Sequence, residues 1–235
     1  MSTVETPRPT THTITNLFFR LLVILLVLGL LLFLPAGRLD WMEAWAFIGA
    51  YGLFLTAYAV WGLWKDPEQL RERSQPAQNT KGWDKVILAA YTVCLLGTFV
   101  VCGLDAGRFQ WSQMPLTLKI IGWIGLAVAA ALIFWSLAVN TYLSRVARIQ
   151  DDRGQVVISD GPYGIVRHPM YLGIIILFLG SSLALGSWWA LIPSGIISIL
   201  FIIRTAKEDR MLQEELAGYK EYTHRVRYRL FPGAW

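Results

Sequence analysis

The 235-residue chain has little charge, few histidines and almost no cysteine. Only 16% of its residues are charged and 55% are hydrophobic, whereas soluble domains carry about 25% charged residues. This composition excludes an ordinary soluble domain, and it excludes disorder for most of the length. The chain is instead rich in aromatic residues, with 11 Trp, 9 Tyr and 11 Phe, which suits a protein anchored at two membrane interfaces.

The scarce metal-binding and nucleophilic residues form no pattern. Cys94 and Cys102 lie in one apolar stretch, without the spacing of a metal site or a disulfide framework, and are expected to be small buried side chains. The three histidines are scattered, so no metal site is predicted. The sequence also lacks GxGxxG, P-loop and GxSxG motifs, which argues against a dinucleotide fold, a phosphate cradle and a hydrolase triad.

Long apolar runs predict four spanning helices, because each is about long enough to cross a bilayer. They cover residues 17–34, 44–64, 86–104 and 116–143. A further apolar block, residues 170–203, is broken at Gly186-Ser187 and contains Pro193. It predicts a helical hairpin with arms of roughly 16 residues, each about 24 Å long by helix rise. Whether this hairpin crosses the membrane completely is left open.

The fold class that follows is all-α, a polytopic integral-membrane helical bundle. Residues 1–16, rich in Thr and Pro, are expected to be a mobile tail and lack the features of a signal peptide. Residues 17–143 hold the four transmembrane helices, and residues 144–235 hold a polar loop, the hairpin and a charged C-terminal segment. Apolar residues recur at helical spacing in that segment, which predicts a cytoplasmic amphipathic helix.

The net charge of +5 has a simple explanation in the positions of the basic residues. If the N-terminus is cytoplasmic, 18 of the 21 Lys and Arg residues fall on the cytoplasmic side and three on the other. Cytoplasmic loops are enriched in Lys and Arg, so the charge indicates topology and gives no reason to expect nucleic acid. The sequence predicts that both termini are cytoplasmic. The missing signal peptide and retention motif are compatible with a bacterial inner membrane.

Two polar patterns could carry chemistry. Residues 150–171, QDDRGQVVISDGPYGIVRHPMY, end at a helix start in which Pro169 suits the first position. Free backbone donors and the helix dipole favour an anion there, and Arg167, His168 and Tyr171 are spaced to converge on one ligand. The simpler alternative is a helix at the membrane boundary whose side chains meet lipid headgroups.

Arg204 and Glu208 form the second pattern, four residues apart where the hairpin's second arm leaves the membrane. They share a helix face and could simply form a surface ion pair, in the weaker orientation. Alternatively, Glu208 could bind a ligand's ammonium group while Arg204 holds an acidic group of a substrate.

These motifs resemble a known family. GPYGIVRHPMYLG, followed after the hairpin by RTAKEDRMLQEELAGYKEY, is similar to the isoprenylcysteine carboxyl methyltransferases and their phospholipid-methyltransferase-like relatives. The likeness covers roughly residues 140–232, and the first three helices carry no matching motif. Asp209 stands where many members have a second Glu, and the loop of residues 150–155 is shorter than in eukaryotic members.

The resemblance implies an S-adenosylmethionine site in residues 144–235, with Arg204 and Glu208 as catalytic residues and no metal. Arg204 would meet the substrate, and Glu208 would also bind the cofactor. The expected cofactor-binding residues are Gln150, Gln155, Val156, Val157, Ile158, Tyr163, Arg167, His168, Pro169, Met170, Tyr171 and Glu208.

The expected reaction is methyl transfer to a carboxylate, or another polar head, of a lipophilic or lipid-modified substrate that enters from the bilayer. A carboxylate would need no general base, whereas a lipid amine would, with Glu208 as the nearest candidate. The alternatives are a phospholipid N-methyltransferase, an NADPH-dependent membrane reductase of the sterol-reductase type with Arg145, Arg148 and Arg153 near the 2'-phosphate, and a non-enzymatic membrane protein. A transporter fits poorly because the spans contain few ionisable residues. The oligomeric state is left open.

Overall fold

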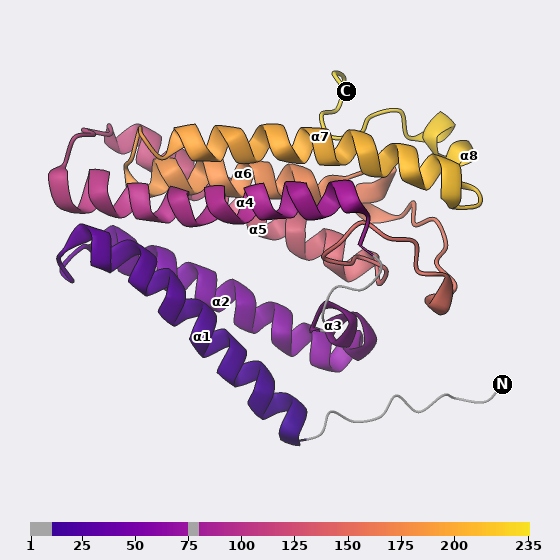
Figure 1. Ribbon diagram of the computed structural model, residues 1–235, viewed down its shortest axis with the longest axis horizontal. Coiled ribbons are helices and arrows are strands. Elements are labelled where there is room, and N and C mark those ends of the chain that lie inside the picture. Colours follow the sequence, from indigo (N-terminus) through magenta and orange to yellow (C-terminus); the bar gives the residue numbers. More distant parts are fainter. Residues whose placement is uncertain (1–10, 75–79) are drawn as a thin grey trace.

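The computed structural model describes residues 11–74 and 80–235, and within these residues it contains helices and no strand (Figure 1). In chain order the elements are α1 (Thr11–Ala36), α2 (Met42–Lys65), α3 (Pro67–Ser74), α4 (Gly82–Cys102), the π-helix η1 (Gly103–Phe109), α5 (Leu116–Val139), the short 3₁₀ helices η2 (Asp151–Arg153) and η3 (Gly161–Gly164), α6 (Pro169–Leu185), α7 (Leu191–Glu215) and α8 (Tyr219–Arg225). The all-α class is confirmed.

Four helices are long and apolar enough to cross a membrane, as the sequence predicts. Their apolar segments cover residues 15–36, 42–65, 82–109 and 116–139. Helices α4 to α7 form a bundle, and α1 and α2 form a pair that meets this bundle at one end and diverges from it at the other (Figure 1). Of the expected N-terminal tail, residues 1–10 lie outside the described part of the chain, whereas residues 11–16 belong to α1.

The third span is longer than predicted because η1 extends α4 to Phe109. Two glycines make this extension possible, since they bring its backbone against the end of α1. A Cβ on Gly103 would lie 2.5 Å from the Leu32 carbonyl oxygen, and one on Gly107 would lie 2.6 Å from Ala36 Cβ. The meeting point of the α1–α2 pair and the bundle therefore depends on residues without side chains.

The predicted hairpin is present as α6 and α7, and Gly186 forms the turn with a φ of 83°. Pro193 lies in the first turn of α7, where a missing backbone donor costs no helical hydrogen bond. The structure differs from the prediction beyond Ile203: α7 continues to Glu215. The charged segment is thus first an extension of the hairpin's second arm, and only residues 219–225 form a separate helix, α8.

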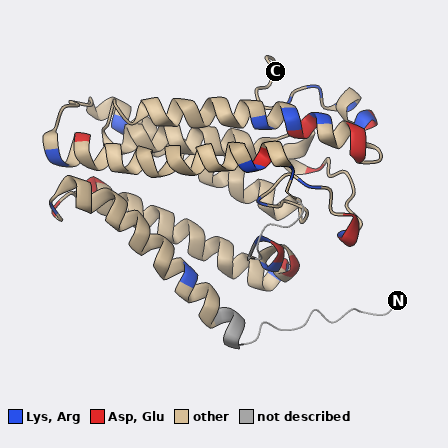
Figure 2. Cartoon of the chain, in the orientation of Figure 1, with Lys and Arg blue, Asp and Glu red and all other residues tan. Residues whose placement is uncertain are grey.

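Charged residues gather at one end of the bundle, and few lie at the other end (Figure 2). Helices α2, α5 and α7 end at the charged end, and α4 and α6 begin there. The short helices α3 and α8 lie at the same end. This end corresponds to the side that the distribution of Lys and Arg assigns to the cytoplasm. It also holds the polar motifs of the sequence.

Candidate active site

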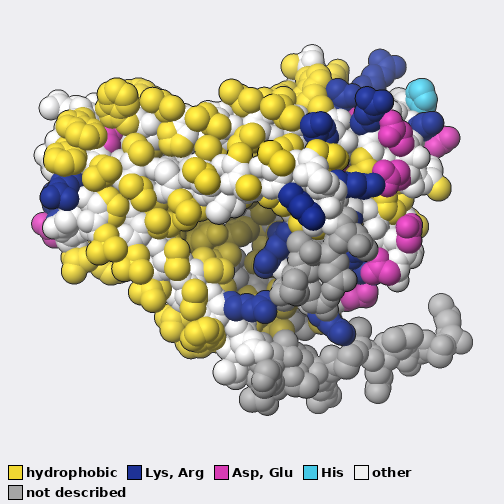
Figure 3. All heavy atoms as spheres, in the orientation of Figure 1, with side chains coloured by type: hydrophobic (Ala, Val, Ile, Leu, Met, Phe, Trp, Pro, Cys, Tyr) yellow, Lys and Arg dark blue, Asp and Glu magenta, His cyan; other side chains and the backbone are white. Residues whose placement is uncertain are grey.

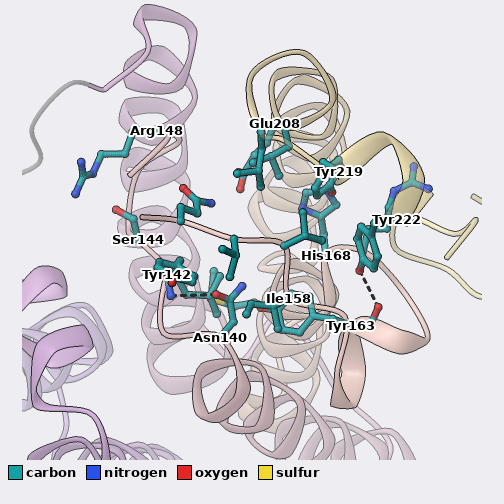
Figure 4. A pocket seen from close by; sticks show the side chains of 18 of the residues that line it. Asn140, Tyr142, Ser144, Arg148, Ile158, Tyr163, His168, Glu208, Tyr219 and Tyr222 are labelled. Atoms are coloured by element: carbon teal, nitrogen blue, oxygen red, sulfur yellow. Dashed lines mark hydrogen bonds between the residues drawn. The ribbon is translucent and has the colours of Figure 1, made fainter. Parts of the chain in front are cut away.

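A pocket opens at the charged end of the bundle, between the start of α6, the middle of α7 and the loop that follows α5. The space between its walls, including open solvent at its mouth, is about 720 Å³. Its lining residues are Asn140, Tyr142, Leu143, Ser144, Val146, Arg148, Gln155, Val156, Val157, Ile158, Tyr163, Arg167, His168, Met170, Tyr171, Glu208, Leu212, Leu216, Tyr219 and Tyr222. Figure 4 shows His168, Glu208 and Tyr219 on one side of the cavity and Tyr142 and Ser144 across from them.

The structure brings together ten of the expected cofactor-binding residues around this pocket. They are Gln155, Val156, Val157, Ile158, Tyr163, Arg167, His168, Met170, Tyr171 and Glu208. Gln150, Pro169 and Arg204 are not among the lining residues. Two segments more than 35 residues apart in sequence thus meet in one cavity, as the spacing of the motifs alone could not show.

Pro169 begins α6, as predicted, and the His168 side chain makes no capping hydrogen bond. The His168 and Tyr171 rings stack with centroids 5.6 Å apart and planes 8° from parallel. Both residues line the pocket, so a helix start and two aromatic faces border the same space. This arrangement can hold an anionic group at the helix end and a flat ring or a cation beside it.

Glu208 is the acidic residue of the lining, and its carboxylate accepts a hydrogen bond from the Tyr171 hydroxyl. This bond uses Oε2, whereas Oε1 takes part in none of the hydrogen bonds found in the described part of the chain. Glu208 is half-buried. It is therefore oriented by Tyr171 and keeps one oxygen for a ligand cation.

Tyr163 supplies an unsatisfied polar atom. Its hydroxyl is buried and has no hydrogen-bond partner among the described residues, although buried hydroxyls nearly always have one. Burial raises the pKa of Tyr163 well above its usual value, so the phenol stays protonated and can donate. Meanwhile the Tyr163 carbonyl accepts a hydrogen bond of 2.7 Å from Tyr222, which fixes the backbone (Figure 4).

Arg167 lies at the pocket, but its guanidinium is already engaged. Nε and Nη2 bind the two carboxylate oxygens of Asp209 at 2.7 and 3.0 Å, and Nη1 donates to the carbonyls of Val226 and Arg227. Nε and Nη2 therefore hold α7 through Asp209, and Nη1 holds the segment after α8. Four of the five N–H groups of the guanidinium are engaged, so Arg167 has little donor capacity left for a ligand carboxylate.

Asp209 is fully buried and collects donors from several elements. They are Arg167, His168, Gln213, Tyr219 and Arg229. Although burial alone would raise the pKa of Asp209, hydrogen bonds from His168 and Arg167 lower it well below its usual range. The carboxylate is thus ionised and fully occupied, which fits a role in holding α6, α7 and the C-terminal segment together.

Arg204 is buried against a partner that the sequence analysis missed. Its Nε and Nη2 bind Asp84 of α4 at 2.7 and 3.1 Å, and Nη2 also donates to the Arg145 carbonyl. The guanidinium carbon lies 5.0 Å from the centre of the Tyr171 ring. Nη1 makes none of the hydrogen bonds formed within residues 11–74 and 80–235, so one end of the group stays available beside the ring that orients Glu208.

Gln150 does not line the cavity, but its hydrogen bonds hold together the loop that does. It is buried, its side-chain amide donates to the Tyr142 carbonyl, and its side-chain carbonyl accepts 2.8 Å from Arg153. Its backbone nitrogen donates to the Gln155 side chain at 2.8 Å. Gln150 therefore closes the turn that presents Gln155 and the residues after it to the pocket.

Ten lining residues are absent from the expected S-adenosylmethionine site, although Arg148 is a candidate in the NADPH alternative: Asn140, Tyr142, Leu143, Ser144, Val146, Arg148, Leu212, Leu216, Tyr219 and Tyr222. Tyr219 and Tyr222 lie in GYKEY, at the end of the second motif that carries the family resemblance, so the resemblance could have indicated them. The residues from 140 to 148 form no helix and carry no pattern of their own, and only the folded loop reveals them.

Residues 118–217 match the model of the phospholipid methyltransferase family. Over this region, fewer than half of its residues, the chain is similar to that family. The match contains the start of α6, Arg204 and Glu208, and it supports a membrane methyltransferase. It ends just before Gly218, so Tyr219 and Tyr222 lie outside it, as do α1 to α4.

Proposed function

We propose that the protein transfers a methyl group from S-adenosylmethionine to a polar group of a lipophilic or lipid-modified acceptor at the cytoplasmic face of a membrane. Residues 144–235 would be the cofactor-binding region. The observation that carries the proposal is the pocket itself: the Glu208 carboxylate, with one oxygen unbonded within the described residues, the start of α6 and the tyrosines border one space, in a chain that matches the phospholipid methyltransferase family model over residues 118–217.

The residues present fit this cofactor. Glu208 Oε1 is placed to accept from its ammonium group, and the start of α6 suits its carboxylate. The aromatic side chains of Tyr163, Tyr171 and Tyr219 offer faces for its adenine or its sulfonium.

When bound, the cofactor supplies an electrophilic methyl group, and the protein's task is to position the acceptor. Arg204 is the first candidate for this task, because Asp84 fixes two of its nitrogens and leaves Nη1 beside Tyr171. The ion pair with Asp84 also offsets the charge of Arg204. A carboxylate acceptor held by such a pair would be oriented and would keep more of its nucleophilicity than beside a lone cation.

A cavity in the membrane part favours a lipophilic acceptor. Side chains of α2, α5 and α6 surround a space of about 650 Å³. Its lining residues are Phe47, Ala50, Tyr51, Phe54, Trp123, Leu126, Ala127, Ala130, Ile133 and Leu177. In Figure 3 the surface is hollowed between the α1–α2 pair and the bundle, with hydrophobic side chains inside. A hydrocarbon chain here would leave its polar head near the charged end of the bundle.

Two alternatives differ in the acceptor and in the cofactor. The family name makes a phospholipid amine the second candidate acceptor, with Glu208 as the base. An NADPH-dependent reductase would need basic side chains for the 2'-phosphate. However, Arg148 binds Glu72 and Asp152, and Arg153 binds Glu68, so two of the three arginines considered for that role are already paired.

The first test measures binding of S-adenosylhomocysteine and of NADPH to the detergent-purified protein by isothermal titration calorimetry. We expect S-adenosylhomocysteine to bind and Glu208→Gln to weaken it about 10-fold to 100-fold, because a charge-assisted hydrogen bond is worth about 1.5–3 kcal/mol. Glu214→Gln is the matched control, since Glu214 lies on the same helix and pairs only with exposed Arg210 among the described residues. Binding of NADPH alone, or an unchanged affinity in Glu208→Gln, would contradict the proposal.

A second arm of this test follows transfer of tritium from methyl-labelled S-adenosylmethionine into a total lipid extract. We expect Arg204→Gln, combined with Asp84→Asn so that no buried charge is left alone, to abolish transfer while S-adenosylhomocysteine still binds. Undiminished transfer would remove Arg204 from the reaction. Base hydrolysis of the labelled product separates a carboxyl methyl ester, which releases methanol, from an N-methyl amine, which does not.

A further inference from the structure

Helix α3 lies outside the family match and makes no part of the pocket wall, but its side chains reach the loop that does. It has only eight residues and follows α2 after a single intervening residue, Asp66. The Asp66 carboxylate accepts from the Gln69 backbone nitrogen at 2.9 Å, which starts the helix. A short polar helix is thus fixed directly to the end of a membrane span.

Gln69 of α3 is fully buried, which is unusual for a glutamine. Its side-chain nitrogen donates to two carbonyls, that of Leu137 at 2.8 Å and that of Asn140 at 2.7 Å. Its side-chain oxygen accepts 3.2 Å from the Tyr58 hydroxyl of α2. Leu137 lies in the last turn of α5 and Asn140 follows its end, where carbonyls lack helical partners. Gln69 therefore joins the end of α2 to the end of α5.

Three further side chains of α3 bind the same loop. Arg73 Nη1 donates to the Leu143 carbonyl at 3.1 Å. Glu72 binds Arg148 at 2.8 Å, and Glu68 binds Arg153 at 3.0 Å. Four of the eight residues of α3 thus hold successive points of the chain from residue 137 to residue 153.

The segment that α3 holds is one wall of the pocket. Its lining residues are Asn140, Tyr142, Leu143, Ser144, Val146 and Arg148. Apart from backbone bonds within the loop, it has little regular structure of its own. Its later part is held by other elements, since Ala147 is buried and donates to Asp84, and the Arg145 carbonyl accepts from Arg204. Irregular chain with few partners opens at low cost, so the position of the wall at Asn140, Leu143 and Arg148 depends on the partners that α3 supplies.

We propose that α3 is a strap that positions this wall for ligand binding, and that Gln69 is its principal positioning residue. The inference rests on the proposed function only in that the ligand probe is S-adenosylhomocysteine. It assigns a role to the N-terminal helices: α2 carries the strap, and the strap holds the wall through Gln69, Glu72 and Arg73. The strap contributes no lining residue itself and acts through the lining residues that it binds, so its effect is on affinity and not on the reacting atoms.

Gln69→Leu tests the strap, because it keeps the size of the side chain and removes both donors. We expect the dissociation constant of S-adenosylhomocysteine to rise about 10-fold, because three hydrogen bonds worth about 1 kcal/mol each are lost and are partly replaced by water. At saturating S-adenosylmethionine, the rate of methyl transfer should stay within about twofold of wild type. Gln113→Leu is the control, since Gln113 is exposed at the opposite end of the bundle and makes no hydrogen bond within the described residues.

Hydrogen exchange separates positioning from a general loss of stability. With Gln69→Leu we expect faster exchange confined to residues 137–155 in the free protein, and restored protection at saturating S-adenosylhomocysteine. Uniformly faster exchange across α4 to α7 would mean that Gln69 only supports the fold, and would overturn the strap.

Glu72→Gln is a milder second variant in case Gln69→Leu does not fold. It frees Arg148 of one partner, and we expect a rise of about threefold in the dissociation constant, against no change in Glu214→Gln. If the wild type binds no S-adenosylhomocysteine, the proposed function fails and the strap fails with it. If the wild type binds and both α3 variants bind equally well, only the strap is overturned.

Discussion

Asp209 and Asp84 each hold one of the arginines that the sequence marks as candidates for binding. Asp209 lies 42 residues from Arg167, and Asp84 lies 120 residues from Arg204. Both carboxylates are fully buried. Removing one partner of such a pair leaves an uncompensated charge in the low-dielectric interior of the protein. The two arginines therefore differ: Arg167 uses all three of its nitrogens in hydrogen bonds that hold the fold together, whereas Nη1 of Arg204 makes none within the described residues.

Asp209→Asn should lower stability in a way that depends on pH. The native pKa of Asp209 is depressed, so its ionisation stabilises the folded state above the unfolded pKa of about 4. This stabilisation is lost as the pH falls below that value toward the native pKa. We expect a deficit of about 3–5 kcal/mol in Asp209→Asn at pH 7, nearly constant to about pH 5 and shrinking below pH 4.

Thermal unfolding of the detergent-purified wild type and Asp209→Asn between pH 7 and pH 3 measures this deficit. Asp151→Asn is the control, because Asp151 is exposed in η2 and its side chain forms no hydrogen bond in the described part of the chain. A deficit that stayed the same at pH 3 would mean that the ionised carboxylate is not what stabilises the fold.

Sequence reasoning found the ligand-facing residues better than the residues that hold them. Glu208 and Tyr171 stand out by motif and spacing, and the structure places both at the pocket. Asp84 and Gln69 could not be found in this way, because their roles depend on partners 63 to 120 residues away. An aspartate in the first turn of a helix, such as Asp84, is expected to interact with the helix dipole. The neighbouring sequence gives no sign that Asp84 is fully buried.

At the level of elements, the close contact between α5 and α6 sets the position of the pocket. Glycines on both helices let the backbones approach: a Cβ on Gly122 would lie 2.4 Å from the Ala184 nitrogen, and one on Gly180 would lie 3.1 Å from the Gly122 carbonyl oxygen. Small residues at such crossings are typical of membrane helices, whose association depends on close packing. Because α6 begins at the pocket, the close packing of α6 against α5 determines where His168 and Tyr171 lie.

Gly122→Val should force α5 and α6 apart, since backbone atoms cannot move aside as a flexible side chain can. We expect a loss of about 1–3 kcal/mol of stability, together with weaker binding of S-adenosylhomocysteine. Unfolding in detergent and titration calorimetry check both effects. Gly195→Val in α7 makes the same change where a Cβ would meet no atom within 4 Å, and an equal loss there would argue against the contact.

The elements that the sequence predicted are those with long apolar runs, because membrane spans need about 20 apolar residues. The elements that the sequence did not predict, α3 and η1, are not formed by long apolar runs. Helix α3 is charged and short, and its stability comes from partners on α2 and on the loop after α5. Similarly, η1 extends α4 through Gly103 and Gly107, and glycines ordinarily weaken a helix.

For the whole molecule, the distribution of charge predicts which side of the membrane carries the site. Helices α3 and α8 lie at the end of the bundle where the charged residues gather (Figure 2), and the residues that line the pocket lie at the same end. The opposite end carries Arg38, Arg108 and Lys119, and two of these pair with acids: Arg38 with Asp40 at 2.7 Å and Lys119 with Glu43 at 2.9 Å. The excess of Lys and Arg thus belongs to the pocket end, which the positive-inside rule assigns to the cytoplasm.

Labelling with a membrane-impermeant maleimide in intact cells tests this orientation. In a background with Cys94→Ala and Cys102→Ala, we introduce either Leu39→Cys, exposed between α1 and α2, or Lys220→Cys, exposed on α8. We expect Leu39→Cys to be labelled in intact cells and Lys220→Cys only after permeabilisation, because α8 packs at the pocket end. The reverse pattern would place the pocket outside, away from cytoplasmic S-adenosylmethionine, and would contradict both the orientation and the proposed reaction.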